Sequence, residues 1–155
     1  MEPKLFIDLA RHIVEQGATR PSQVSLRRAI STAYYALFHA LAQNGADLLV
    51  GRTARSSPAW QRVYRGLEHG RAREACDNTL AMSRFPAAIQ DFGEVFVLMQ
   101  FQRRRADYDP HAHFLKSSVT YDINTAEQAI KNFAAVGDNL RRDFSVHVLF
   151  KSRRP

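Results

Sequence analysis

The sequence predicts an all-α protein, an antiparallel up-and-down bundle of four long helices with one or two short ones. Apolar residues recur with helical period in several segments, and the pattern is clearest from Leu26 to Ala42. The single β-like fragment, 118–121, is too short to found a sheet. The predicted connections are short, which favours antiparallel packing of neighbouring helices. These connections lie near Gly17, Gly45, Gly70 and Pro110.

The first helix is predicted from Pro3 to Gln16, with the proline in its first turn and Gly17 as its stop. Its apolar residues share one face, so we expect this helix to flank the central one. They are Leu5, Phe6, Leu9, Ile13 and Val14. Ser22 is a suitable N-cap for the helix that follows.

The central helix, 26–42, has two packing faces. One is a stripe of larger apolar residues from Leu26 to Leu41, and the other is a stripe of alanines that would let another helix approach closely. A helix with so wide an apolar arc must be surrounded, either within one bundle or between the bundle and a second copy. Tyr35 and His39 project together from it, and a buried pair that satisfies its own hydrogen bonds is the simplest interpretation. The segment 43–45 is expected to end the helix.

The middle of the chain is predicted to be less regular. A basic loop is expected over 51–57, followed by a short helix that Ser57 caps and that ends near His69 and Gly70. The segment 71–80 extends this helix after a break.

Two stronger helices are expected in the second half. The first covers 86–103, and the segment 103–114 then reads as a helix end and turn. The last helix is expected to begin at a capping box of Asn124 and Glu127 and to continue to the C-terminal region with a bend at Gly137.

Length and composition indicate one domain, 1–155, with a loose basic tail over 151–155. Hydrophobic residues make up 45% of the chain and charged residues 24%, which is ordinary for a soluble globular protein. Cys76 is the only cysteine, so no intrachain disulfide can form, and a reducing, cytoplasmic setting is expected. No N-terminal signal or membrane-spanning stretch is recognisable, and no membrane partner is expected.

The formal charge of +7 favours polyanionic partners. Arginine supplies eighteen of the twenty-two basic residues, and its planar guanidinium can bind two phosphate oxygens at once. A solvated basic surface would give the same charge, so the two readings stay open. The candidate phosphate contacts on RNA are Arg52, Arg55, Arg62 and Arg65, together with the arginines at 103–105.

Two segments resemble the HEPN family of small prokaryotic helical domains. They are AISTAYYALFHAL at 29–41, similar to an early helix of the family, and RRRADYDP at 103–110, similar to its arginine-led motif. Many members of that family are metal-independent ribonucleases in which a histidine follows an arginine after four to six residues. Others are partners of minimal nucleotidyltransferases.

The resemblance implies a catalytic set of Arg104 or Arg105, which would hold the scissile phosphate, and His111, which would exchange the proton. The residues expected to shape this site are Arg103, Asp107, Tyr108 and Asp109. One departure counts against catalysis. In a subgroup of the family the leading arginine aligns with Arg103, and Tyr108 then stands where a histidine would be.

The arginine–histidine spacing is also a weak signal by itself. His69 and His147 satisfy the same spacing, so only location favours His111.

Two functions of different classes follow from the sequence. The first is a metal-independent endoribonuclease, a toxin of a toxin–antitoxin or defence system. The second is a non-catalytic helical module that partners a minimal nucleotidyltransferase or binds nucleotide or RNA. The expected partners are RNA, a second copy of the chain in a homodimer, and a nucleotidyltransferase-type antitoxin. No cofactor or metal is implied, because His111 and His113 lack a third ligand at suitable spacing and no glycine-rich phosphate loop is present.

Overall fold

The computed structural model describes residues 1–16 and 19–153. Within these ranges the chain forms eight α-helices and one 3-10 turn and contains no strand, which confirms the all-α prediction. The predicted helix stop at Gly17 and the end of the predicted tail, 154–155, lie outside the described residues. The tail from Lys151 to Arg153 is exposed and has no helical structure.

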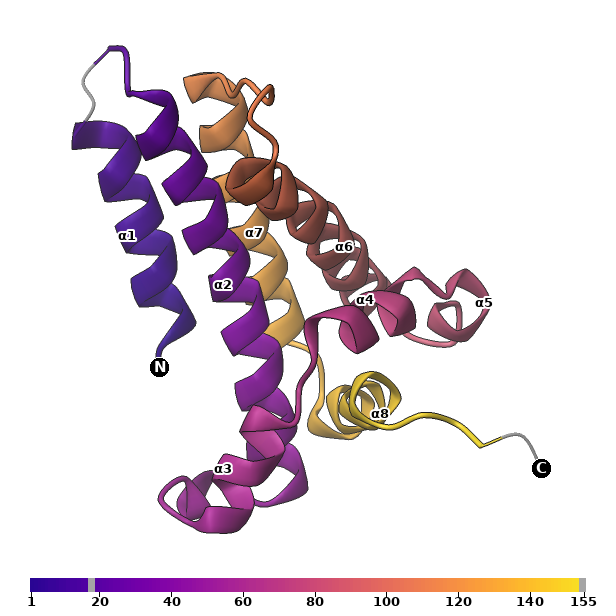
Figure 1. Cartoon of the computed structure of the whole chain (residues 1–155). Helices are drawn as coiled ribbons and strands as arrows, with labels where there is room; N and C mark the ends of the chain where they lie inside the picture. The colour runs from indigo at the N-terminus through magenta and orange to yellow at the C-terminus, as the bar shows by residue number, and fades with distance from the viewer. Residues whose placement is uncertain (17–18, 154–155) are drawn as a thin grey trace.

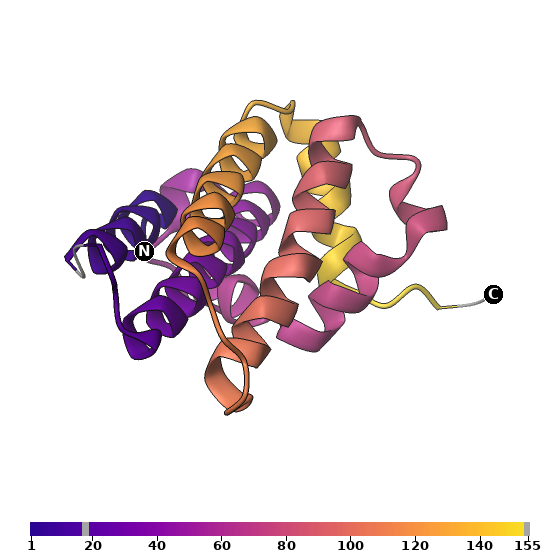
Figure 2. The same ribbon diagram turned by 90° about the horizontal axis from the view of Figure 1, so that it is seen from above.

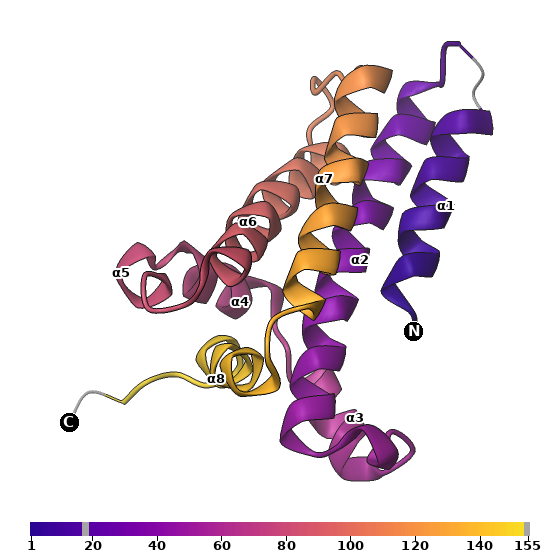
Figure 3. The same ribbon diagram turned by 180° about the vertical axis from the view of Figure 1, so that it is seen from behind.

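The helices pack around α2, which runs the length of the molecule (Figure 1). Their order is α1 (Pro3–Gln16), α2 (Gln23–Leu49), the 3-10 turn η1 (Arg52–Ala54), α3 (Pro58–Arg65), α4 (His69–Asp77), α5 (Thr79–Met82), α6 (Ala87–Tyr108), α7 (Lys116–Ala134) and α8 (Asp138–Leu149). Seen from above, α1, α2 and α7 lie together and α6 leans against α7 and α2 (Figure 2). The rear view shows α8 crossing below α4 and α6 (Figure 3).

Helix α2 is longer than the sequence predicts. The Ser22 hydroxyl caps its start by accepting a hydrogen bond from the Ser25 backbone N–H at 3.1 Å. The prediction that 43–45 ends the helix is wrong, because the helix continues to Leu49. The Asn44 side chain instead donates to Ser145 Oγ at 2.7 Å, and Gly45 lets the α8 side chain of Leu149 approach. Tertiary packing therefore overrides the low helix propensity of this segment.

The alanine stripe of α2 is enclosed by the chain itself except at Ala40, which is half-buried. Ala29, Ala33 and Ala36 are fully buried, and α2 contacts α1, α6, α7, α8 and α3. The apolar arc that suggested a second copy against this helix is therefore covered within one chain, and the homodimer prediction loses that support.

Helix α1 has the predicted bounds but buries a narrower face than predicted. Its buried residues are Ile7, Ala10 and Val14, which are spaced to form one stripe toward α2 and α7. Leu5 and Leu9, which were predicted on the packing face, are exposed. A helix on the outside of the bundle packs against its neighbours through one narrow stripe. The apolar residues on either side of that stripe therefore remain exposed to solvent.

The segment after α2 also differs from the prediction. Ser57 caps α3 as predicted, accepting from the Trp60 N–H at 3.2 Å. However, α3 ends at Arg65, and His69 begins a separate helix, α4, instead of ending α3. Gly66 is the C-cap of α3, and residues 66–68 separate it from α4, so the run that sequence periodicity joined is two helices.

Helix α6 extends five residues beyond the predicted end at Arg103, to Tyr108. Pro110 disfavours helical geometry only at the residue before it, and Asp109 is indeed extended (φ −92°, ψ 108°). The motif 103–108 is therefore helical. Successive residues of the motif consequently point to different sides of α6.

The predicted last helix is two helices, α7 and α8, separated at 135–137. The β-like fragment 118–121 is part of α7. Asn124 lies inside α7 and does not cap it; its side chain accepts a hydrogen bond from Arg11 Nη2 at 2.9 Å. The cap-like sequence at 124–127 thus serves a contact between α1 and α7.

None of the helices in the described ranges combines the length and hydropathy needed to cross a membrane.

Candidate functional site

A cluster of polar side chains lies where α2, α4 and α6 meet. We call it the polar cluster and define it by its members, which are Ser31, Tyr34, Tyr35, His69, Arg103 and Asp107. Helix α2 contributes Ser31 and Tyr35 from successive turns of one face, and Tyr34 is adjacent. Helix α6 contributes Arg103 and Asp107, also one turn apart, and His69 begins α4.

Arg103 links the two long helices. Its Nη2 donates to the Tyr35 hydroxyl at 3.4 Å, and its guanidinium lies over the rings of Tyr34 and Tyr35, at 5.7 and 5.6 Å from their centroids. Its Nε is 2.9 Å from Asp107 Oδ2 in an ion pair, but the N–H is not directed at the oxygen, so Nε is buried without a hydrogen bond. Ser31 Oγ donates a short hydrogen bond to Asp107 Oδ1. These contacts hold the guanidinium at a fixed place, with its side chain 17% exposed.

His69 is held on three sides. Its Nδ1 lies 2.7 Å from the Tyr34 hydroxyl, and its ring stacks on Phe38 with centroids 4.1 Å apart. Gln100 of α6 donates from Nε2 to the His69 carbonyl at 3.0 Å and so fixes the start of α4. The Nε2 atom of His69 has no hydrogen-bond partner among the described residues. This nitrogen is therefore the one available to a ligand.

The surroundings favour a neutral imidazole. Burial is the largest cause that lowers the pKa of His69 below its ordinary 6.5, and the nearby positive charge of Arg103 lowers it further. Burial also raises the pKa of the Tyr34 phenol, so its hydroxyl stays protonated. A neutral histidine beside a guanidinium combines a group that can accept a proton with one that can bind an anion.

A second histidine lies on the same side of α2. His39 Nδ1 is 2.5 Å from the Tyr64 hydroxyl of α3, and its ring stacks on Phe6 of α1 at 4.8 Å. Burial lowers the pKa of His39 too, with smaller contributions from the N-terminal amine and His69. His39 joins α1, α2 and α3, and it has no hydrogen bond to the polar cluster within the described structure.

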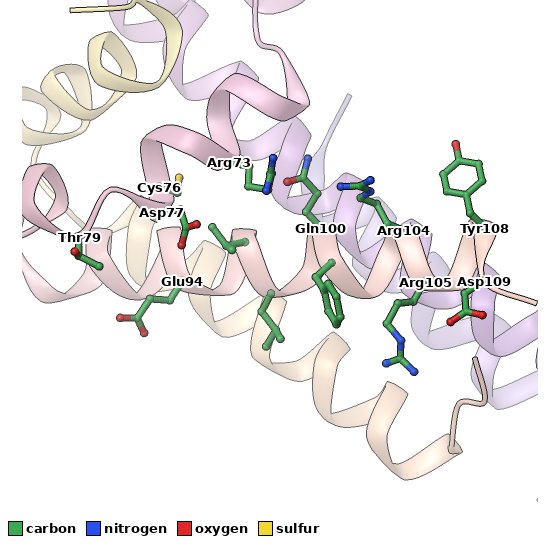
Figure 4. A pocket seen from close by; sticks show the side chains of 13 residues that line it. Arg73, Cys76, Asp77, Thr79, Glu94, Gln100, Arg104, Arg105, Tyr108 and Asp109 are labelled. Carbon is green, nitrogen blue, oxygen red and sulfur yellow. The ribbon is translucent and has the colours of Figure 1, made fainter. Parts of the chain in front are cut away.

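The structure separates the residues that the sequence grouped into one site. Arg103 and Asp107 belong to the polar cluster. A different set lines a groove of about 860 Å³ along the other side of α6, between it and α4 and α5 (Figure 4). From the predicted site these are Arg104, Arg105, Tyr108 and Asp109.

The predicted catalytic trio is not drawn together by any contact in the described ranges. His111 is exposed in the loop after α6, where its backbone N–H donates to Asp109 Oδ1 at 2.9 Å. Arg105 Nη1 donates to Gln102 Oε1 at 3.0 Å, and its guanidinium lies 5.5 Å from the centroid of the Phe114 ring. Arg104 is exposed.

The four predicted phosphate contacts fall into two pairs. Arg52 binds both carboxylate oxygens of Asp138, at 3.2 and 3.3 Å, and Arg55 binds both of Asp47, at 2.7 and 3.1 Å. The other pair, on α3, is exposed and has no ion-pair partner among the described residues. These are Arg62 and Arg65, which border a shallow hollow of about 530 Å³.

Sequence analysis did not identify His69 as a member of the polar cluster. The signal for Tyr35 and His39 was visible as a spacing of four on α2, but it indicated only a core pair. His69 matched a spacing rule that other histidines also matched, and nothing in the chain order placed it beside Arg103. Only the packing of α4 on α6, with His69 bonded to Tyr34 of α2 and Gln100 of α6, brings these residues together.

Across the described residues, no three His, Cys, Asp or Glu side chains are arranged as ligands for a metal ion. Cys76 is buried at the α4–α6 contact, and burial raises the pKa of its thiol to about 12. No family model, curated protein or solved structure matches this chain.

Proposed function

We propose that this protein is a metal-independent endoribonuclease that works in the cytoplasm and that the polar cluster is its site. The observation that carries the proposal is a neutral imidazole, His69, held by Tyr34 with Nε2 free and set beside the fixed guanidinium of Arg103. The resemblance of 29–41 and 103–110 to the HEPN family supports it, and on that resemblance the cleavage would serve a toxin–antitoxin or defence system.

In this proposal His69 acts as the general base. Nδ1–H donates to the Tyr34 oxygen, so the lone pair on Nε2 takes the proton of a ribose 2′-hydroxyl. The 2′-oxygen attacks the adjacent phosphorus, and the bond from phosphorus to the 5′-oxygen breaks. The products are a 2′,3′-cyclic phosphate and a 5′-hydroxyl end. A chain without a 2′-hydroxyl gives no reaction, which accounts for RNA over DNA.

Two further residues have roles in this scheme. Arg103 stabilises the negative charge on the phosphorane. The Tyr35 hydroxyl accepts a hydrogen bond from Arg103, so its own hydrogen remains free to be donated to the leaving 5′-oxygen. The imidazolium of His69 then returns its proton through solvent to the Tyr35 phenolate, so both residues regain their starting protonation states after one turnover.

The proposal moves the site away from Arg104, Arg105 and His111. Those arginines line the groove along α6 and have no hydrogen bond to the polar cluster among the described residues, and His111 is exposed in a loop with no charged partner in the described structure. A loop histidine in water has neither the fixed orientation nor the dry surroundings that make acid–base catalysis efficient.

The test is cleavage of a single-stranded RNA, in a metal chelator, by the parent and by His69→Asn. The amide nitrogen of asparagine can replace Nδ1 in the contact with Tyr34, but nothing replaces Nε2. We expect the rate to fall by roughly 10²–10⁴-fold, the usual contribution of a general base. Products of the parent should carry 2′,3′-cyclic phosphate ends.

The matched control is His111→Asn, which should cleave at the rate of the parent because His111 is outside the polar cluster. Equal melting temperatures of the three proteins would show that the fold is kept. If His111→Asn loses activity while His69→Asn keeps full activity, the catalytic site is in the loop that carries His111, and its assignment to the polar cluster is refuted.

One observation favours the non-catalytic module as a second candidate. Arg103 is already engaged by Asp107 and by the two tyrosine rings, as expected of a side chain that ties α2 to α6. If the pure parent cleaves no RNA while Arg103→Ala lowers the melting temperature, the cluster is a structural tie. The protein is then a binding module, and a nucleotidyltransferase-type partner becomes the first one to test.

A further inference from the structure

The groove between α6 and the α4–α5 segment has a mostly apolar surface (Figure 4). Its apolar wall comes from one stretch of α6, where Val97, Leu98 and Phe101 line it. Leu98 is 46% exposed and Phe101 59%, so the rest of the described chain leaves both largely uncovered. The volume of about 860 Å³ is within the range of small-molecule sites. The groove is therefore a candidate site for a ligand with an apolar part.

Two arginines supply free positive charge to the groove. Arg73 projects from α4 and Arg104 from α6, and both are exposed. Neither has an ion-pair partner among the described residues. In Figure 4 their guanidinium groups lie on the same side of α6, to either side of Gln100. Arg105 is different, because it is half-buried and its guanidinium lies over the ring of Phe114.

Carboxylates line both ends of the groove. Asp77 and Glu94 lie toward α5, and Asp109 lies at the opposite end, beyond Arg104 (Figure 4). None of the three carboxylates is in an ion pair within the described ranges. A ligand with several negative charges along its length, such as RNA or a nucleoside polyphosphate, would be repelled by them. The charges therefore favour a ligand with one negative charge and an uncharged body.

We propose that this groove binds an amphipathic carboxylate, a small molecule with one carboxylate head and an unbranched apolar chain. The carboxylate lies between Arg73 and Arg104, and the chain lies along Phe101 and Leu98 toward Val97. Val97 and Arg104 are seven positions apart on α6. At 1.5 Å per residue the apolar wall is about 10 Å long, which suits the chain of a medium-length fatty acid.

Each part of such a molecule has a counterpart in the groove. Guanidinium groups that have no carboxylate of their own can hold the head by charge-assisted hydrogen bonds. The chain covers the exposed surface of Leu98 and Phe101, and removing that apolar surface from water favours binding. The far end of the chain has no charge, so it can lie near Asp77 and Glu94 without the repulsion that a second carboxylate would meet.

The groove is separate from the proposed catalytic site. None of the six residues of the polar cluster lines it. Ligand binding can therefore be measured without any RNA, and its result does not depend on whether the polar cluster is catalytic.

The test is a titration of the whole protein with octanoate, followed by the backbone amide signals in NMR spectra. We expect shifts in α4 and α6 that saturate with a Kd of about 1 mM or tighter. Octan-1-ol, which has a chain of the same length and no charge, should bind at least roughly ten-fold more weakly, because it cannot pair with the two guanidinium groups. AMP should not displace octanoate.

Two variants and two matched controls locate the site. Arg104→Gln and Leu98→Asn should each weaken octanoate binding roughly ten-fold, since one removes a partner of the head and the other a contact of the chain. Arg28→Gln on α2 makes the same exchange at an exposed arginine outside the groove. Leu9→Asn on α1 does so at a leucine that is 49% exposed. Both controls should bind octanoate as the parent does, and equal melting temperatures show that all four variants are folded.

Several results would overturn the proposal. They are an absence of shifts in α4 and α6 at about 10 mM octanoate, ten times the expected Kd, equal affinity for octan-1-ol, and unchanged binding by Arg104→Gln. Displacement of octanoate by AMP would make the groove a nucleotide site instead. A groove closed by a second copy would give a mass of twice 17.6 kDa in sedimentation and no octanoate shifts, which would equally refute the proposal.

Discussion

At the scale of single residues, the fold sets the protonation of two histidines, His39 and His69, mainly by burial. His69 and His39 each place one ring nitrogen against a tyrosine hydroxyl and stack on a phenylalanine, His69 on Phe38 and His39 on Phe6. Both therefore have a pKa below the ordinary value of 6.5. Protonating either imidazole costs free energy only in the folded state, because in the unfolded chain both rings are in water.

This predicts a loss of stability in mild acid. The folded pKa lies below the unfolded one, so the stabilisation is complete above about pH 6.5 and is lost as the pH falls through the folded pKa. Urea unfolding from about pH 7 to about pH 5 should show a falling free energy of unfolding, and His69→Asn should reduce the dependence by up to one proton.

The comparison between parent and variant removes the other titrating groups. Burial raises the pKa of Asp122, so that carboxyl changes the stability in the opposite direction as the pH falls. It is unchanged in His69→Asn. A pH dependence identical in the two proteins would show that His69 does not carry the effect.

At the scale of elements, α2 is extended and held by a polar joint with α8. The Asn44 side chain donates to Ser145 Oγ at 2.7 Å and accepts from Arg141 Nη1 at 2.8 Å. Ser145 is fully buried, and Ser145 Oγ also donates to the Arg141 carbonyl at 3.0 Å. The joint satisfies the polar groups that α8 brings under α2, so a helix that propensity would end at 43–45 continues to Leu49.

Asn44→Ala should therefore be costly although alanine is the better helix former. The change leaves Arg141 and the buried Ser145 hydroxyl short of a partner, which we expect to cost about 1–3 kcal/mol in the free energy of unfolding. Asn132→Ala is the matched control on α7, where the exposed side chain bonds only Gln128 among the described residues, and should change stability by less than about 0.5 kcal/mol. Denaturant unfolding measures both, and equal effects would argue against the joint.

At the scale of the whole molecule, the positive charge is divided between engaged and free arginines. Arg52 and Arg55 are bound by carboxylates, whereas Arg62 and Arg65 are exposed on α3. The same helix contributes Tyr64, whose hydroxyl bonds His39 beside the polar cluster. A polyanion that reaches the cluster can therefore run along α3.

RNA binding should depend on the two free arginines more than on the two paired ones. Each of Arg62→Ala and Arg65→Ala should weaken binding and reduce the slope of log affinity against log salt by about 1, as loss of one phosphate contact does. Arg52→Ala and Arg55→Ala should change the slope less, because Asp138 and Asp47 compete for those guanidinium groups. Filter binding over a salt series gives the slopes. Equal slopes in all four variants would indicate that the RNA does not run along α3.

The sequence by itself determined the fold class and several helix ends. These features are local: the helical period, the caps at Ser22 and Ser57, and the bounds of α1. Each is set by residues within one or two helical turns of each other, so it can be predicted from the sequence alone. The same local rules failed where distant contacts decide. Asn44 and Gly45 continue a helix because α8 lies against them, and Asn124 looks like a cap yet bonds Arg11.

Only the tertiary structure decided which residues form the candidate site. Arg103, Arg104 and Arg105 are neighbours in the chain, but once 103–108 is helical they point in different directions, Arg103 toward α2 and the other two toward the groove. His69 and Arg103 are more than thirty residues apart in the chain, and the packing of α4 on α6 brings both of them to Tyr34 of α2. Sequence spacing fixes the direction of a side chain only when the helix and its neighbours are known, because direction on a helix changes by about 100° per residue.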